Sequence, residues 1–451
     1  MALDSKAISA KALSLDFGVR EIADAVASGD LTPTDIAESV LARIDETEGK
    51  IQAFSQYDAA DVRAQADALT AEAAAGKLRG PLHGVPVSIK EWFNVKGFPN
   101  LMRGADTYID TQDATVVARL RDAGAIIVGK THTPLNGSPP PTRNPWNLEH
   151  TAGGTSSGCG ASVGARVVPI SIGEQTSGSN LRPAAYCGVG GIKPSYGRLS
   201  RSGMWASGFS RDHPGLIGLN MADMALVMSV LTGYDPGDES TNKFQPMPAD
   251  LKMSEFAPPS IGVVRNFFPE KTQPVMQEAV EKSAATMSTA GATVKDVMLP
   301  PNYGLAWEAI PMIGAEAATR RAGEPAPTGS RAASRRAAEL LPAPYYIQAR
   351  RIRTWLNQEV KMLMATEGLD ALLMACAPGP APYSLASTGD ATLLQCWSFL
   401  GVPAITVNGG LSPEGLPLGL QMVAPQGEDY ALMRVGAWSE SALGLLPAPS
   451  F

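Results

Sequence analysis

The sequence predicts a single α/β domain over residues 1–451, and three observations support this prediction. First, residues 115–130 give a helical pattern, a glycine stop and an apolar strand, a succession that suits helices layered on a sheet. Second, short apolar runs with strand patterning recur along the chain. Third, 44% of the residues are hydrophobic and 18% are charged, which describes an ordinary globular protein. The length also allows two or three domains, but large α/β enzymes can form one.

Composition and charge exclude several classes of function. The net charge of −7 argues against nucleic acid as a partner. The four cysteines form no CxxC pair and the four histidines lack metal-ligand spacing, so we expect no metal and no cofactor. The N-terminus has no apolar signal region, and no run of eighteen apolar residues occurs. We therefore expect a cytoplasmic protein without a membrane segment.

Residues 1–76 are predicted to form an N-terminal helical layer, with helices from residue 18 onward. Thr32 offers a helix cap and Pro33 a first-turn proline. Apolar residues follow at helical spacing over residues 36–44, and the alanine-rich stretch 59–75 continues the pattern.

A strand that ends in a lysine is predicted next. Val85, Val87 and Ile89 alternate with other residues, as in a half-buried strand, and Lys90 ends that strand. A lone lysine in this position is usually a solvated charge, and these residues alone leave that alternative open. A second strand is predicted over residues 125–128.

Two glycine- and hydroxyl-rich loops then flank an apolar run. The loops span Gly153–Gly160 and Gln175–Ser179, and the run spans Val167–Ile172. Glycine lets backbone N–H groups approach a ligand closely, and serine and threonine supply hydroxyls. A flexible linker has a similar composition, but the apolar run needs a core in which to be buried. No lysine follows the glycines in the pattern of a nucleotide-binding loop.

The remaining chain alternates helical and strand patterns. We expect a helix over residues 221–231, strands over 261–264, 292–297 and 370–374, and mostly helical structure over about 302–368 with a long amphipathic run at 345–365.

Four motifs in this chain occur together in one known family. The chain shows GGTSSGCG, an apolar run, GEQTSGS and RPAAYCGVGGIKPSYG, after an earlier GVPVSIKEW. This order resembles the amidase signature family of serine hydrolases, whose pattern is GGSSxGS, a strand, G-T-[DQ]-x-G-G-S and an A-x-x-C-G segment. The resemblance covers most of residues 20–235 and 370–435. In motif it is similar to malonamidase-like and urethane-cleaving members.

The resemblance implies a fold and a catalytic triad. The implied fold is the amidase signature fold, a mixed central β-sheet covered by helices on both faces. By motif position, Ser179 matches the nucleophile and Lys90 the catalytic base. The family relays the proton through a second serine held in a cis peptide. Thr155 stands at that position here, and Ser156 is the fallback relay.

The role of Lys90 as a base requires a particular environment. A lysine accepts a proton only when it is neutral, which requires burial away from carboxylates. We therefore expect Lys90 to lie apart from acidic side chains, and the enzyme to work best at neutral to alkaline pH.

The chain departs from the family pattern at two positions, and one of them lies in the implied oxyanion hole. By resemblance, this hole is formed by the backbone N–H groups of Thr176, Ser177 and Gly178. Ser177 replaces a glycine, and its Cβ restricts the backbone. Thr155 replaces a serine, and its β-branch stiffens χ1. These changes leave a catalytically weakened binding protein as an alternative from another functional class.

Arg182 lies three residues after Ser179, as in malonamidase-like members. Either it clamps a substrate carboxylate or it forms a structural ion pair, and the sequence favours neither. The other substrate-binding residues that we expect are Gly154, Ser156, Gln175, Trp92 and Trp205. The tryptophans suit an apolar or aromatic acyl group.

The expected substrate is a small carboxamide or carbamate (urethane). The alternative enzyme is the glutamine-amidase subunit of a tRNA-dependent amidotransferase, which would need a partner protein. The sequence leaves open whether the protein forms a homodimer. Residues 302–368 match no family pattern, and we expect them to form a variable helical cover over the pocket.

Overall fold

The computed structural model describes residues 17–103, 108–135, 138–320 and 330–450. The strands are β1 (Phe54–Tyr57), β2 (Pro86–Lys90), β3 (Ile126–Thr131), β4 (Arg143–Asn144), β5 (Asn147–Thr151), β6 (Ile170–Gln175), β7 (Gly190–Lys193), β8 (His213–Gly218), β9 (Ser260–Val264), β10 (Thr293–Val297), β11 (Ala371–Ala375), β12 (Ala404–Leu411) and β13 (Pro417–Val423). An 11-stranded mixed sheet has the order β1-β3-β2-β6-β8-β7-β12-β13-β11-β9-β10, and β4 pairs with β5 separately.

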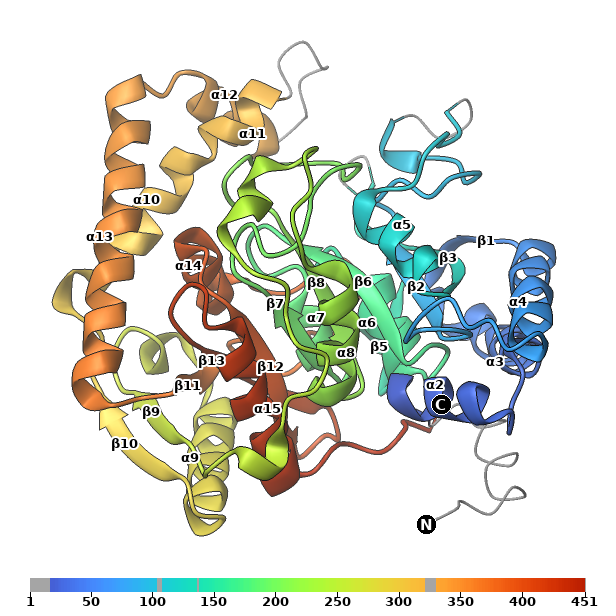
Figure 1. Cartoon of the computed structure of the whole chain (residues 1–451). Coiled ribbons are helices and arrows are strands. Elements are labelled where there is room, and N and C mark those ends of the chain that lie inside the picture. Colours follow the sequence, from blue (N-terminus) through green and yellow to red (C-terminus); the bar gives the residue numbers. More distant parts are fainter. Residues whose placement is uncertain (1–16, 104–107, 136–137, 321–329, 451) are drawn as a thin grey trace.

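Helices flank this sheet (Figure 1). They are α2 (Val19–Ser28), α3 (Pro33–Ile51), α4 (Ala59–Ala74), α5 (Thr115–Asp122), α6 (Ser157–Gly164), α7 (Leu181–Tyr186), α8 (Met221–Leu231), α9 (Pro274–Thr289), α10 (Leu305–Ile313), α11 (Ala315–Arg320), α12 (Ser330–Glu339), α13 (Ala343–Glu367), α14 (Thr392–Leu400) and α15 (Asp429–Leu443). In one layer α15 packs on α8 and α9, and in another α6 packs on α7. The predicted α/β fold with a mixed central sheet is confirmed.

Three neighbouring strands of the sheet, β3, β2 and β6, are parallel, so their carboxyl ends lie at the same side of the sheet. β2 pairs in parallel with both β3 and β6, with Ile89 beside Ile172. Every residue of β2 is buried, so the prediction of a half-buried strand is wrong. An interior parallel strand is covered on both faces and does not alternate in exposure. Ligand sites in such sheets lie outside the carboxyl ends, where Lys90 ends β2 and Gln175 ends β6.

The described part of the N-terminal segment, from residue 17 onward, contains three helices and one strand. Thr32 accepts a hydrogen bond from the backbone N–H of Asp35, and Pro33 is the first residue of α3, so the predicted cap is confirmed. Residues 54–57, however, form β1 and pair antiparallel with β3 at the sheet edge. Gln52 ends α3 in the left-handed conformation, with φ of 53°. Six residues then remain before α4, and four of them form β1.

The described residues of the segment 302–368 are mostly helical, as predicted. α13 buries Ala349, Leu356, Val360 and Met364, and α10 packs against both α13 and α14. Figure 1 shows α10 and α13 at the opposite end of the molecule from α3 and α4. Whether these helices cover a substrate pocket stays a prediction. No helix in the described ranges has the length and apolarity needed to cross a bilayer.

Candidate active site

The two glycine- and hydroxyl-rich loops lie against each other at the carboxyl ends of β2 and β6. The backbone N–H of Ser156 donates to the carbonyl of Ser179 over 3.0 Å. Gly154 has φ of +63°, and a Cβ there would lie 2.6 Å from Pro183 Cδ. Only glycine fits this close approach. The close packing brings the residue after Gly154, Thr155, to the turn that carries Ser179.

Lys90 contacts three groups in this interior. Its Nζ donates to Thr155 Oγ1 over 2.6 Å and to Glu174 Oε2 over 2.9 Å. The side chains of Lys90 and Glu174 are both 0% exposed. The Nζ atom also lies 4.2 Å from the centroid of the Trp92 ring, a distance at which the ring attracts a cation. Lys90 is therefore no solvated charge.

The expectation that Lys90 lies apart from acidic side chains is wrong. Glu174 lies on β6, the strand next to β2, and its carboxylate forms a buried ion pair with Lys90. Glu174 is a site residue that the sequence motifs did not identify. The available signal was the acid in GEQTSGS, at a position where the family pattern has threonine.

A second carboxylate extends this network. The hydroxyl of Thr176 lies 2.8 Å from Glu174 Oε1 and 2.7 Å from Asp212 Oδ1. Asp212 is fully buried and accepts from the backbone N–H groups of Ser207 and Gly208. Burial, and then the charge of Glu174, raises the pKa of Asp212 to about 6. The Thr176 hydroxyl thus lies between two carboxylates, and Asp212 takes up a proton near pH 6.

The turn before Ser179 contains backbone N–H groups that are available to a ligand. Among the described residues, the N–H groups of Thr176, Ser177 and Gly178 donate no hydrogen bond. The Ser177 carbonyl, in contrast, accepts from Ser398 Oγ over 2.7 Å, which anchors the turn to α14. No positive φ is recorded at Ser177, so its Cβ is accommodated without the strain that a left-handed conformation would cause.

Ser179 is largely enclosed, with 8% of its surface exposed. Its hydroxyl makes no hydrogen bond in the described part of the chain, including none with Thr155. All peptide bonds of the described residues are trans, so the cis peptide that the resemblance implies is not found at Thr155.

Two of the expected substrate-binding residues, Gln175 and Ser156, have side chains that are hydrogen-bonded within the protein, and their role in substrate binding stays a prediction. Gln175 is fully buried; its Oε1 accepts from the N–H groups of Asn180 and Leu181, and its Nε2 donates to Ser398. The Ser156 hydroxyl donates to the carbonyl of Glu174 over 3.1 Å. Both side chains therefore hold the strand β6 and the turn after it. Gly154 acts through its lack of a side chain.

Arg182 is a buried cation without an acidic partner among the described residues. It is 5% exposed, and its Nη1 donates to the Gly389 carbonyl over 2.8 Å. Its Nε makes no hydrogen bond within the described chain. Burial lowers the pKa of Arg182, and neighbouring Tyr186 and Asp390 partly offset this. The structural ion pair, one of the two expectations for Arg182, is not observed.

Two tryptophans line the region around Lys90. Trp92 is buried, and its Nε1 donates to Thr133 over 3.1 Å. Trp205 is half-buried, and its backbone N–H donates to the Trp92 carbonyl over 2.7 Å. The two residues are thus joined through their backbones beside Lys90.

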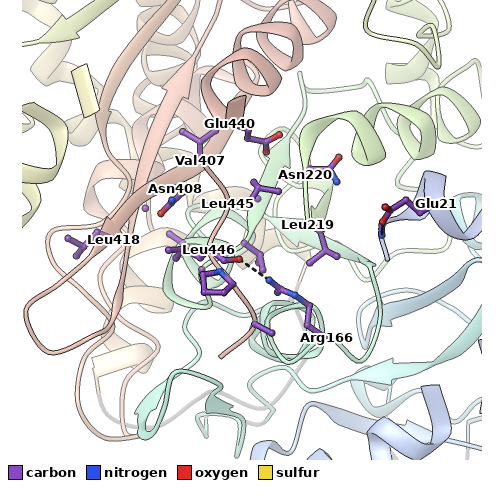
Figure 2. A pocket seen from close by; sticks show the side chains of 18 residues that line it. Glu21, Arg166, Leu219, Asn220, Val407, Asn408, Leu418, Glu440, Leu445 and Leu446 are labelled. Carbon is purple, nitrogen blue, oxygen red and sulfur yellow. Dashed lines mark hydrogen bonds between the residues drawn. The ribbon is translucent and has the colours of Figure 1, made fainter. Parts of the chain in front are cut away.

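A separate cavity of about 390 Å³ lies at the other end of α7 (Figure 2). Its lining includes Arg166, Asn220, Asn408 and Glu440, and the C-terminal segment crosses it, with Arg166 donating to the Leu446 carbonyl over 3.1 Å. Ser179 precedes α7, whereas this cavity follows it. No described group of three or more His, Cys, Asp or Glu residues is arranged to hold a metal ion, here or elsewhere.

The sequence matches the family model described as Amidase over residues 35–433. A glutamyl-tRNA(Gln) amidotransferase subunit of Anaeromyxobacter dehalogenans (strain 2CP-C) is 33% identical over 482 residues, covering 96% of this chain and 97% of that protein. The protein of the same name from Chlamydia pneumoniae is 32% identical and covers 93% of this chain and 94% of its own.

The chain is also similar to solved structures over most of its length. The native peptide amidase from Stenotrophomonas maltophilia aligns with a TM-score of 0.83 and 26% identity, over 97% of this chain and 99% of that one. An inhibitor-bound chain from a vestigial protein complex, described with an s-triazine catabolic enzyme, aligns with a TM-score of 0.87 and 27% identity, over 96% and 100%.

Proposed function

Because the chain belongs to the amidase family and is an amide-hydrolysing enzyme, we propose that it cleaves the C–N bond of a small carboxamide or carbamate through an acyl-enzyme on Ser179. The observation that carries this proposal is the 2.6 Å contact between Lys90 Nζ and Thr155 Oγ1, in a loop packed against the Ser179 turn. Acyl transfer requires a base and a relay hydroxyl near the nucleophile, and this contact supports those roles for Lys90 and Thr155.

The proposed proton path runs from Ser179 through Thr155 to Lys90. As Ser179 Oγ attacks the carbonyl carbon, its proton passes to Thr155, and Thr155 passes its own proton to the neutral amine of Lys90. The same path returns a proton to the leaving nitrogen. Water then hydrolyses the acyl-enzyme. Thr155 is the relay in this proposal because the Ser156 hydroxyl is already bonded to the Glu174 carbonyl.

The spare N–H groups of the turn are proposed to hold the developing oxyanion. Those of Thr176, Ser177 and Gly178 precede Ser179 directly. Fixed backbone donors cost no reorganisation during the reaction, and losing one such donor typically slows catalysis by about 10²–10³-fold.

We assign the substrate a carboxylate and an apolar or aromatic acyl group. Arg182 supports the first feature, because a buried guanidinium with an unused Nε provides a charge-assisted contact for an anion. Trp92 and Trp205 support the second, as apolar walls beside the base.

A fluorophosphonate probe tests the nucleophile. We expect one covalent label, located at Ser179 by peptide mass, that is absent from Ser179→Ala and kept in the control Ser156→Ala. Ser179→Ala and Lys90→Ala should each lower kcat by at least about a thousandfold, since groups that act as a unit fail together. If Lys90→Ala kept more than about a tenth of kcat, equivalent to about 1.4 kcal/mol of barrier, the lysine assignment would be wrong.

The second candidate function is the glutamine-amidase subunit of a tRNA-dependent amidotransferase. Its support is the 33% identity to the Anaeromyxobacter dehalogenans protein over 96% of this chain. This function predicts a stable partner protein, and glutamine hydrolysis that rises when the partner is present. Purification of a fully active chain by itself, on substrates other than glutamine, would exclude it.

A further inference from the structure

Four buried or half-buried side chains form one hydrogen-bonded chain from the proposed base to the far side of the site. Lys90 contacts Glu174 over 2.9 Å, Glu174 contacts Thr176 over 2.8 Å, and Thr176 contacts Asp212 over 2.7 Å. The proposed mechanism uses only the first of these side chains.

Charged and titratable groups face this chain from each element packed around it. Besides Lys90, Glu174 and Asp212 themselves, they are Cys159 on α6, and Arg201 and Arg211 between β7 and β8. Another buried lysine, Lys130 on β3, is paired with Glu91 at 2.9 Å and Asp110 at 3.7 Å. Within the described residues, Glu174 is the one carboxylate at ion-pair distance from Lys90.

The proposed reaction and the ion pair favour opposite protonation states of Lys90. Nucleophile activation needs the neutral amine. A carboxylate at 2.9 Å in a site closed to solvent favours the ammonium, because deprotonating Lys90 leaves Glu174 as an uncompensated buried charge. The Trp92 ring, 4.2 Å from Nζ, favours the ammonium as well.

We propose that Glu174 is a positioning residue that keeps the proton on Lys90 at neutral pH, so that the enzyme becomes fully active only in alkaline solution. This inference rests on the proposed function of Ser179, Thr155 and Lys90. In alkaline solution Lys90 first loses one proton to hydroxide. On attack, the Ser179 Oγ–carbon bond forms, the carbonyl π electrons move to oxygen, and the serine proton reaches Nζ through Thr155. Glu174 then pairs with the regenerated ammonium and favours this transfer.

The test is the pH dependence of kcat/KM, which reports the protonation of the free enzyme. For the unmodified enzyme we expect the acid limb to reach half-height above about pH 7.5. Glu174→Gln keeps the size of the side chain and an oxygen acceptor, and should move this limb to lower pH by at least about one unit, a tenfold change along the limb.

Glu91→Gln is the matched control, because it removes an equally buried carboxylate from the residue next to Lys90. Its lysine partner is Lys130, so the limb should stay within about 0.3 pH units of its original position. Glu174→Asp lengthens the contact to Lys90 and should move the limb in the same direction as Glu174→Gln, by less. It also serves as the test if Glu174→Gln does not fold, as judged by its melting curve.

Three results would overturn the inference. The first is an acid limb of the kcat/KM profile that reaches half-height below about pH 7 in the unmodified enzyme. The second is an acid limb that stays at the same pH in both Glu174 variants. The third is an acid limb that moves equally far in Glu91→Gln. An unmoved limb together with an inactive Ser179→Ala would refute only the role of Glu174. An active Ser179→Ala would refute the proposed function and this inference together.

Discussion

Thr155 carries a hydroxyl and a methyl group on one carbon, and only the hydroxyl can pass a proton to Lys90. Thr155→Ser keeps that hydroxyl and frees χ1, so activity should be kept or increased. Thr155→Val keeps the shape of threonine but removes the proton path and strands polar partners, at roughly 1–3 kcal/mol each. Its kcat should fall by about a hundredfold or more. Steady-state kinetics on one amide substrate measures both effects.

Ser156→Ala is the control for this pair. Its hydroxyl bonds to the Glu174 carbonyl, so the variant should lose stability more than kcat. An active Thr155→Val together with an inactive Ser156→Ala would instead make Ser156 the relay. If both variants stayed active, water would carry the proton.

Arg182 offers a test of substrate class. If Arg182 binds a substrate carboxylate, Arg182→Met should raise KM for carboxylate-bearing amides by about 10–100-fold, the size of a hydrogen bond to a charged group. KM for neutral amides of the same acyl group should change by less than about threefold. Equal increases for both kinds of substrate would mean that Arg182 only holds the Gly389 loop.

Motif position located Lys90, Thr155 and Ser179, and the structure places the first two in contact. The same motif contained Glu174, but its role depends on which strands are neighbours. β2 and β6 are 80 residues apart at Lys90 and Ile170 and pair directly in the sheet. Local pattern carries no information on that pairing, so the acid beside the base could not be inferred from spacing.

At the scale of elements, α15 places a carboxyl group at the start of α8. Both oxygens of Glu440 accept from the backbone N–H of Met221, and Glu440 lies at the cavity shown in Figure 2. Burial raises the pKa of Glu440 to about 8. The folded state therefore binds a proton that the unfolded state releases between about pH 4.5 and pH 8. This group stabilises the fold fully below that window, and the stabilisation is lost as the pH rises through it.

Glu440→Gln removes this titration. We expect the variant to be more stable than the unmodified protein at pH 8.5, by an amount on the order of a few kcal/mol, with the difference shrinking towards pH 5. Urea unfolding at both pH values measures it. Exposed Glu414→Gln is the control and should leave the pH dependence unchanged. A Glu440→Gln variant that loses the same stability with pH would contradict this account.

Most elements could be predicted from their own residues, and the exceptions have physical causes. The helix at residues 221–231 and the strands near residues 261, 293 and 371 follow from local periodicity. β1 is only four residues long, and it forms because β3 offers an edge with which it can pair. The sheet order follows from contacts between distant segments, which no local pattern encodes.

At the scale of the whole molecule, activity should be independent of metal ions. The histidines and cysteines lack ligand spacing in the sequence, and the described residues hold no cluster that would bind a metal. After dialysis against a chelator, kcat/KM should stay within about twofold of its starting value. A loss of activity that zinc restores would contradict this expectation.

The hydrogen bond that anchors the Ser179 turn to α14 joins two segments that the ribosome synthesises at different times. Ser398 holds the Ser177 carbonyl from 221 residues further along the chain, and β7 obtains its second neighbour only when β12 is present. At about 5–20 residues per second, a ribosome needs on the order of 10–40 s to reach Ser398 after Ser177. During that time, the nascent chain already contains every residue of the proposed proton path but not the segment that fixes their geometry. A chain that stops before Asp390 should therefore be catalytically silent, and each newly made molecule should become an enzyme only after Ser398 has been synthesised.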